Sequence, residues 1–135
     1  MKILIILAST LILTGCFDSG DVQIIEGDGA KLGQTTFEEN CMHCHGKEGK
    51  GTTKDWKKRL PNGKFPAPPL NGSAHAWHHS PKLLLSTINN GGAKLGGWMP
   101  AFKDQLNENE KQAVLNYIHD LWPQEIQKKY DKRFK

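Results

Sequence analysis

Cysteine is scarce in this sequence: only Cys16, Cys41 and Cys44 occur among its 135 residues. A zinc ribbon or zinc finger needs a second pair of cysteine or histidine ligands at short spacing, and no second Cys-x-x-Cys pair exists to complete four-coordination. Alternating apolar and polar stretches typical of strands are also lacking, so the βαβ context of a thioredoxin-like dithiol is absent. These two common explanations of a Cys-x-x-Cys pair therefore fit poorly.

A strong excess of charge is lacking too. The chain holds 18 Lys and Arg against 14 Asp and Glu, a formal net charge of +4. No basic cluster is interleaved with aromatic residues, so no nucleic-acid partner is predicted. Internal repeats and low-complexity tracts are missing as well. The composition predicts one modest domain and gives no information about its partner.

Long hydrophobic runs are limited to one, from Ile3 to Leu13, which follows Lys2 and ends in a Leu-Thr-Gly-Cys sequence at Cys16. This run is too short to span a bilayer comfortably as a permanent helix, and its position is typical of an export signal. The ending resembles a bacterial lipoprotein box, which implies cleavage before Cys16 and acylation of that cysteine. The alternative is an uncleaved N-terminal anchor. We predict that residues 1–15 are a lipoprotein signal peptide.

The remaining chain divides into three parts. Residues 16–30 are rich in glycine and acids and have no sustained apolar period, so we predict a lipid-anchored flexible tether. Residues 31–123 form the predicted domain, and residues 124–135 a basic C-terminal extension. The expected location is the periplasmic side of a bacterial membrane. Phe17, in place of an aspartate after the lipidated cysteine, favours the outer membrane by resemblance to sorted lipoproteins.

The most informative motif is Cys41-Met42-His43-Cys44-His45. Two thiols separated by two residues and followed at once by a histidine form a c-type haem attachment site. On one helical turn, both thiols can form thioethers with the same porphyrin, and His45 can place an imidazole nitrogen under the iron. The motif therefore predicts one covalently bound haem c, with His45 as an axial ligand.

Helix signals occur in three places. The first helix is expected from about Leu32 into the attachment motif. The second begins after Ser80, with a proline at its first position, and ends at Gly91. The third begins at Asn107, where a glutamate three residues later completes a capping box, and stops at Pro123. The sequence thus predicts an all-α fold.

The order and spacing of these elements resemble class I cytochrome c over most of residues 31–123. Gly33 and Phe37, ahead of the attachment motif, look like that family's N-terminal helix, and the segment around Tyr117 and Ile118 resembles its C-terminal helix. The resemblance implies a cytochrome c fold, with three or more helices packed around one haem. It also implies that the two helices cross near Gly33, where a glycine lets two backbones approach closely.

That family takes a second axial ligand from the other face of the haem, usually a methionine on a late loop. The Trp-Met-Pro-Ala-Phe segment around Met99 resembles this loop, and Met99 is the candidate. Met1 is lost with the signal, and Met42 lies inside the attachment motif, from which it cannot reach the opposite face. The alternative role for Met99 is that of a methionine filling the core.

The segment from Phe65 to Leu70 resembles the proline-rich loop on the histidine side of the haem in the same family. A backbone carbonyl near Pro68 would accept a hydrogen bond from Nδ1 of His45, which fixes the orientation of the imidazole and raises its basicity. The alternative is that this segment is only an extended connector.

Both axial positions of the iron would then be filled, by His45 and Met99. Such an iron is suited to passing one electron and poorly suited to binding oxygen, and thioether ligation raises its reduction potential relative to bis-histidine ligation. We therefore expect a membrane-tethered one-electron carrier in a respiratory or other extracytoplasmic redox chain, or an electron-transfer subunit of a larger respiratory assembly, and not an enzyme in its own right. Its partners would be the membrane, through Cys16, and an oxidase, reductase or dehydrogenase.

The segment 52–80 departs from the simplest family pattern and contains His75, His78 and His79. Imidazoles three or four residues apart can share a helical face and bind copper, which makes a copper-handling protein an alternative. The other interpretation is that these histidines lie at the surface or bond haem propionates, as Trp77 could through its indole N–H. A haem sensor with a displaceable distal ligand is a further alternative.

The C-terminal extension repeats apolar residues at Ile126, Tyr130 and Phe134 among basic residues. It is expected to be an amphipathic helix that lies on the domain, on anionic lipid or on an acidic partner, or else a solvated extension. His43 and His119 are expected to face solvent.

Overall fold

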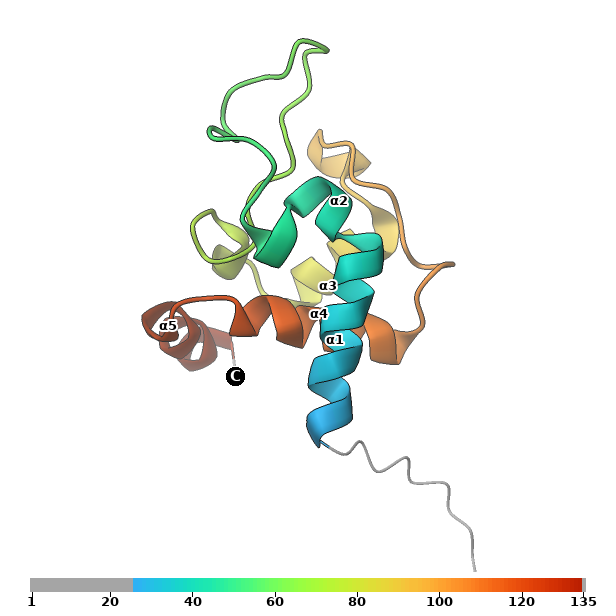
Figure 1. Ribbon diagram of the computed structural model, residues 1–135, viewed down its shortest axis with the longest axis vertical. Coiled ribbons are helices and arrows are strands. Elements are labelled where there is room, and N and C mark those ends of the chain that lie inside the picture. The colour runs from blue at the N-terminus through green and yellow to red at the C-terminus, as the bar shows by residue number, and fades with distance from the viewer. Residues whose placement is uncertain (1–25, 135) are drawn as a thin grey trace, which may run out of the picture.

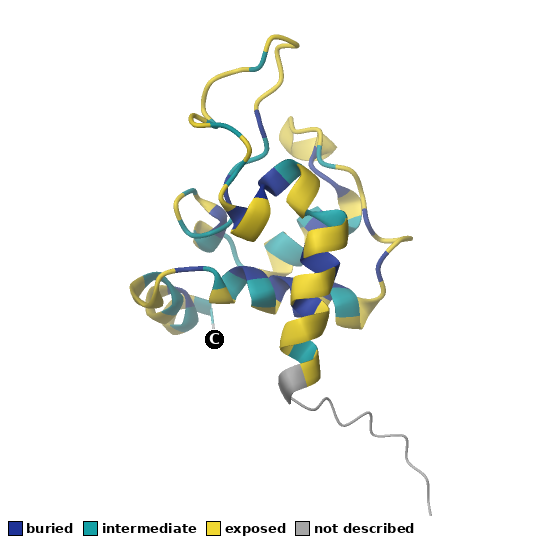
Figure 2. Ribbon diagram, viewed as in Figure 1, coloured by how far each residue is buried: buried dark blue, intermediate teal, exposed yellow. Residues whose placement is uncertain are grey.

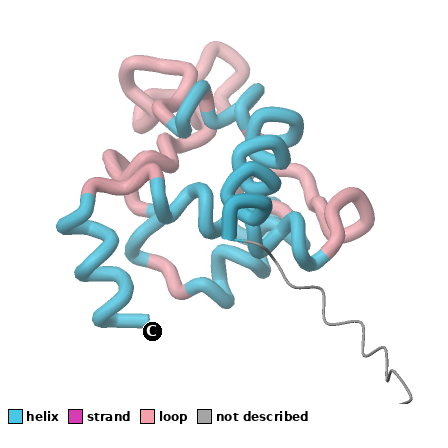
Figure 3. Tube along the Cα trace, turned by 60° about the horizontal axis from the view of Figure 1, so that its bottom comes forward, coloured by secondary structure: helices cyan, strands magenta, loops and turns pink. Residues whose placement is uncertain are grey.

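The computed structural model describes residues 26–134 and contains helices and loops but no strand in that range (Figure 3). The all-α expectation is confirmed. The α-helices are α1 (Glu26–Asn40), α2 (Met42–His45), α3 (Pro81–Asn90), α4 (Glu108–Asp120) and α5 (Gln124–Phe134). Three short 3₁₀ helices, η1 (Lys47–Gly49), η2 (Ala76–His78) and η3 (Ala93–Leu95), interrupt the loops. Cys16, Phe17 and the predicted signal peptide lie outside the described residues.

Helices α1 and α4 cross at the centre of the molecule (Figure 1). A Cβ atom added to Gly33 would lie 2.3 Å from the carbonyl oxygen of Ala113, so the backbones touch at this point. One turn further along, the fully buried Phe37 packs on Tyr117 with 5.3 Å between the ring centroids. The predicted crossing of the first and last helices of the domain is therefore confirmed.

The first helix is longer than expected. It begins at Glu26 instead of near Leu32, so the end of the predicted tether, residues 26–30, is helical. The two glycines in this part disfavour a helix, but Asp28 places a negative charge in the first turn, where it interacts favourably with the helix dipole.

The ends of α3 and α4 follow the sequence signals. The hydroxyl of Ser80 accepts a hydrogen bond from the Leu83 amide, and α3 ends at Gly91, whose φ is +74°. At the start of α4, Asn107 and Glu110 form the reciprocal capping box, with bonds of 2.9 and 2.8 Å.

We expect Asn107→Ala to lower the free energy of unfolding by about 1 kcal/mol, because it leaves the Glu110 amide without its acceptor. The control is Asn116→Ala on the exposed face of the same helix, which is expected to change stability by less than about 0.5 kcal/mol. Urea unfolding followed by circular dichroism measures both. Equal losses in the two variants would contradict the capping contribution.

The core lies between α1, α3 and α4, and the outer faces of the helices are exposed (Figure 2). Helix α5 extends this core, since Tyr130 is 5% exposed and lies against Trp122. The expectation that His119 faces solvent was wrong. Its side chain is 17% exposed because its ring packs near those of Trp122 and Tyr130, and its Nε2 lies 3.1 Å from Asp131.

Candidate haem site

The attachment motif forms a single helical turn directly after α1. Cys41 precedes α2, and its carbonyl oxygen accepts hydrogen bonds from the amides of Cys44, at 3.2 Å, and His45, at 2.9 Å. Both cysteines are free thiols and partly buried. Burial, with a smaller contribution from Cys44, raises the pKa of Cys41 to about 11, so its thiol is protonated at neutral pH.

His45 is buried, and its Nδ1 lies 2.8 Å from the carbonyl oxygen of Pro68. A carbonyl can only accept, so Nδ1–H donates and the lone pair of Nε2 stays free. Burial lowers the pKa of His45, against the opposing effect of this hydrogen bond. The imidazole is thereby kept neutral, in the tautomer that a metal ligand needs, and its partner is the carbonyl that the family resemblance implies.

Two glycines let the chain turn sharply after His45. The Gly51 amide donates to the His45 carbonyl at 2.7 Å. Gly46 has a φ of +76°, and a Cβ atom there would lie 2.2 Å from the Gly51 carbonyl oxygen. No other residue fits at Gly46 without moving this backbone.

Residues 65–70, here called the proline loop, run beside this turn. Leu70 donates its amide to the Gly49 carbonyl at 2.7 Å, and Pro69 packs on Gly51. The carbonyl of Leu70 accepts a hydrogen bond from Nε1 of Trp122 at 2.8 Å. Trp122 was not predicted from the sequence, because a contact between residues so distant in the chain leaves no local pattern.

Met99 lies in a loop that is closed on the end of α3. Its carbonyl accepts a hydrogen bond from the Gly92 amide at 3.0 Å, and a Cβ atom on Gly91 would lie 2.5 Å from the same oxygen. On the far side of Met99, the Phe102 amide donates to the Ile88 carbonyl at 2.9 Å. The side chain of Met99 is half-buried against the core. The backbone that carries this candidate ligand is therefore fixed on both sides.

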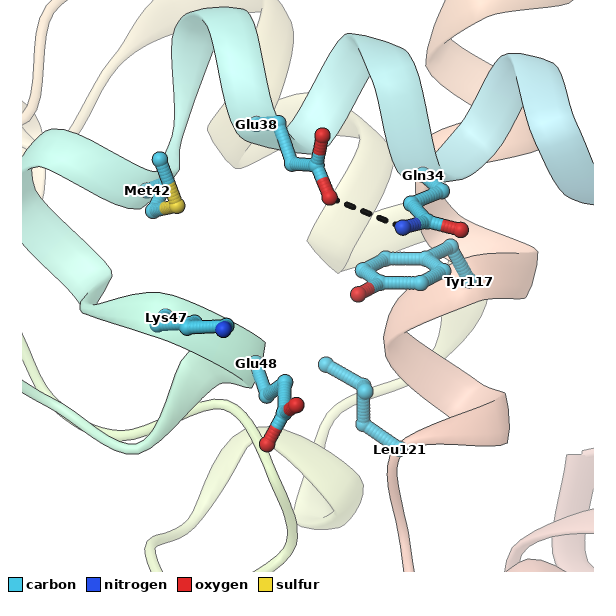
Figure 4. Close-up of a pocket in the computed structure, with 7 residues that line it drawn as sticks. All are labelled: Gln34, Glu38, Met42, Lys47, Glu48, Tyr117 and Leu121. Atoms are coloured by element: carbon cyan, nitrogen blue, oxygen red, sulfur yellow. Dashed lines mark hydrogen bonds between the residues drawn. The ribbon is translucent and has the colours of Figure 1, made fainter.

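Met42 lies elsewhere. Its side chain is one of seven that line a pocket of about 300 Å³ between α1, the turn after α2 and α4 (Figure 4). Tyr117 and Leu121 form the α4 side of this pocket, and His45 is not among its lining residues. This position agrees with the exclusion of Met42 as the second axial ligand.

Exposed apolar side chains lie in the proline loop and in the loop that carries Met99. Phe65, 45% exposed, begins the proline loop, and Trp98, 41% exposed, precedes Met99. Nε1 of Trp98 donates to the Phe65 carbonyl at 2.7 Å and so joins the two segments. Leu95, in the same loop as Met99, is 69% exposed. A covalently attached haem requires two thiols, an imidazole with a free nitrogen, a second axial ligand such as a thioether, and apolar side chains to cover its faces. This part of the chain contains all of these groups.

The side chains of the histidine cluster point to different neighbours. Within residues 26–134, no group of three or more His, Cys, Asp and Glu side chains is placed to hold a metal ion. His75 and His79 lie with ring centroids 5.4 Å apart, whereas the ring of His78 packs edge-on against Trp77. The α-helical face assumed for these histidines is absent, because residues 76–78 form a 3₁₀ turn. The structure therefore does not provide the helical face assumed for copper binding, and the copper alternative stays a prediction. Trp77 is half-buried against the core, and its bond to a propionate stays a prediction.

The fold, the attachment motif and the tautomer of its histidine define a c-type cytochrome. The family described as cytochrome c oxidase, cbb3-type, subunit III, matches residues 28–118, and the chain belongs to it.

Several curated relatives are subunits of cbb3-type cytochrome c oxidases. The chain is 32% identical over 96 residues to subunit FixP of Bradyrhizobium diazoefficiens, covering 71% of this chain and 29% of that protein. It is 35% identical over 92 residues to FixP of Azorhizobium caulinodans, covering 68% and 27%. It is 32% identical over 99 residues to subunit CcoP of Rhodobacter capsulatus, covering 68% and 29%. The chain therefore spans less than a third of the length of these relatives. No solved structure gives a significant match.

None of the helices between residues 26 and 134 has the length and apolar character needed to cross a membrane.

Proposed function

We propose that this chain is a one-electron carrier with a single haem c, attached through Cys41 and Cys44 and ligated by His45 and Met99. The observation that carries the proposal is the 2.8 Å contact between His45 Nδ1 and the Pro68 carbonyl, which leaves Nε2 available to iron. The haem supplies one-electron exchange between ferric and ferrous iron. The protein contributes the anchor, the two ligands and their rigid backbone supports.

The partner that we propose is a cbb3-type oxidase. The matched relatives are named as subunits of that enzyme, and the chain shares with them the region that contains the attachment motif. The chain covers only a minor part of those proteins, so their partner has to be tested for this chain directly. The test is electron transfer from the reduced protein to an isolated cbb3-type oxidase.

Membrane attachment is proposed to come from acylated Cys16 after removal of residues 1–15. The supporting observation is the Leu-Thr-Gly-Cys sequence that follows the apolar run. The residue after Cys16 is Phe17 and not an aspartate, which favours anchoring in the outer membrane, on the periplasmic side. Labelling with a fatty acid, compared between the native chain and Cys16→Ala, tests the anchor. Equal labelling of the two would refute it.

The proposed function is tested by producing the full chain in cells competent for cytochrome maturation. We expect a mass increase of one haem and an oxidised spectrum with a near-infrared methionine-to-iron charge-transfer band. The reduced native protein should bind no carbon monoxide, since both axial positions are filled. A product without covalent haem would refute the proposal, and ready carbon monoxide binding would favour a haem sensor.

A further inference from the structure

Helix α5 lies beyond the region that the family match covers, which ends at residue 118. It follows α4 after a short turn and contacts η2, in the loop that continues from the proline loop (Figure 1). The turn comes very close to that loop, because a Cβ atom on Gly72 would lie 2.8 Å from Cδ of Pro123 and 3.3 Å from Cδ1 of Ile126. The C-terminal segment is thus packed directly on the part of the chain that follows Pro68.

Trp122, at the junction of α4 and α5, makes the central contact. It is 3% exposed, and its Nε1 donates to the Leu70 carbonyl at 2.8 Å. Its ring lies 4.8 Å from that of Tyr130, which projects from α5 and is itself buried, and 5.2 Å from that of His119. A buried indole packed against two neighbouring aromatic rings has little freedom to move its N–H group.

Leu70 is two residues after Pro68, whose carbonyl oxygen meets His45. The residue between them is Pro69, and its ring fixes φ at that position. The loop is held at its other edge by the bonds from the Leu70 and Asn71 amides to the Gly49 carbonyl, at 2.7 and 3.2 Å. A displacement of the Leu70 carbonyl is therefore transmitted to the Pro68 carbonyl through a short, stiff stretch of backbone.

We propose that Trp122, seated by α5, is a positioning residue for His45. By holding the Leu70 carbonyl it keeps the Pro68 carbonyl at hydrogen-bond distance from Nδ1. That bond increases the donor strength of the imidazole toward the iron and fixes the orientation of its plane. A stronger donor stabilises ferric iron, so the contact lowers the reduction potential. The proposal rests on the proposed ligation by His45 and gives the C-terminal extension a role in tuning the haem.

The test is Trp122→Phe in the haem-loaded full chain. Phenylalanine preserves an aromatic ring in contact with Tyr130 and His119 but removes the N–H donor. We expect a reduction potential more positive than that of the native protein, measured by spectroelectrochemical titration. We also expect displaced hyperfine-shifted haem methyl resonances in the NMR spectrum of the oxidised protein, because these depend on the orientation of the axial imidazole.

The matched control is Val114→Ala, which removes buried atoms from α4 at a fully buried position in the core. It is expected to lower stability while leaving the potential and the methyl resonances unchanged. Tyr130→Ala in the full chain removes the α5 ring that packs on Trp122 and is expected to shift the potential in the same direction as Trp122→Phe.

A Trp122→Phe protein that only loses stability, as Val114→Ala does, would overturn the positioning role. A Tyr130→Ala protein with the native potential would overturn the part assigned to α5. Both results differ from failure of the proposed function, in which the native chain itself would carry no covalent haem.

Discussion

Met99→Ala is expected to open one axial position of the haem and to change three properties together. The charge-transfer band should disappear, the reduced protein should bind carbon monoxide, and the reduction potential should fall. The fall is expected because the thioether favours ferrous iron over the water that would replace it. Its size should be on the order of 0.1 V or more, within the roughly 0.8 V over which axial ligands set haem potentials.

The control is Met42→Ala, the same chemical change at a side chain that lies in the pocket beside α4. It is expected to leave the spectrum, the potential and the response to carbon monoxide unchanged. A different result would contradict ligation by Met99: a native protein without the charge-transfer band, together with a Met99→Ala protein whose iron is still six-coordinate. The second ligand would then be a histidine, and His79 would be the next residue to replace.

Gly33→Ala is expected to destabilise the protein although alanine is the better helix former. Alanine gains about 1 kcal/mol over glycine in the interior of a helix. At Gly33, however, the new Cβ atom would lie 2.3 Å from the Ala113 carbonyl oxygen, a backbone atom that moves only if the two helices separate. Overpacking of this kind costs about 1–3 kcal/mol, and a separation at the helix crossing also disturbs Phe37. We expect a net loss of up to about 2 kcal/mol.

Urea unfolding of the haem-loaded protein measures this loss. Thr35→Ala, on the exposed side of the same helix, is the control and is expected to change stability by less than about 0.5 kcal/mol. A Gly33→Ala protein more stable than the native one would mean that helix propensity outweighs the contact with α4.

Local signals in the sequence predicted much of the architecture. The limits of α3 and α4 follow from Ser80, Gly91 and Asn107, whose side chains or backbone conformations act within a few residues. The position of Gly33 at the crossing followed from family resemblance, and so did the pairing of His45 with Pro68. The helix limits could be predicted because capping residues and glycine at positive φ restrict the local backbone conformation.

Other features depend on contacts between distant residues, for which the sequence has no local pattern. The contact of Trp122 with Leu70 and the burial of His119 arise only when α5 folds back on the domain. The histidine cluster shows how a spacing pattern depends on the local conformation. Its spacing fits one helical face, but the chain between residues 75 and 79 forms a 3₁₀ turn that directs His78 to Trp77.

The early start of α1 limits how far the domain can stand from a lipid anchor. From Cys16 to the first residue of the helix, Glu26, the backbone takes ten steps, which cover at most about 35 Å in any conformation. A chain acylated at Cys16 would therefore keep its haem within a few nanometres of the bilayer surface. Any redox partner would then have to reach the haem within that thin layer next to the membrane that holds Cys16.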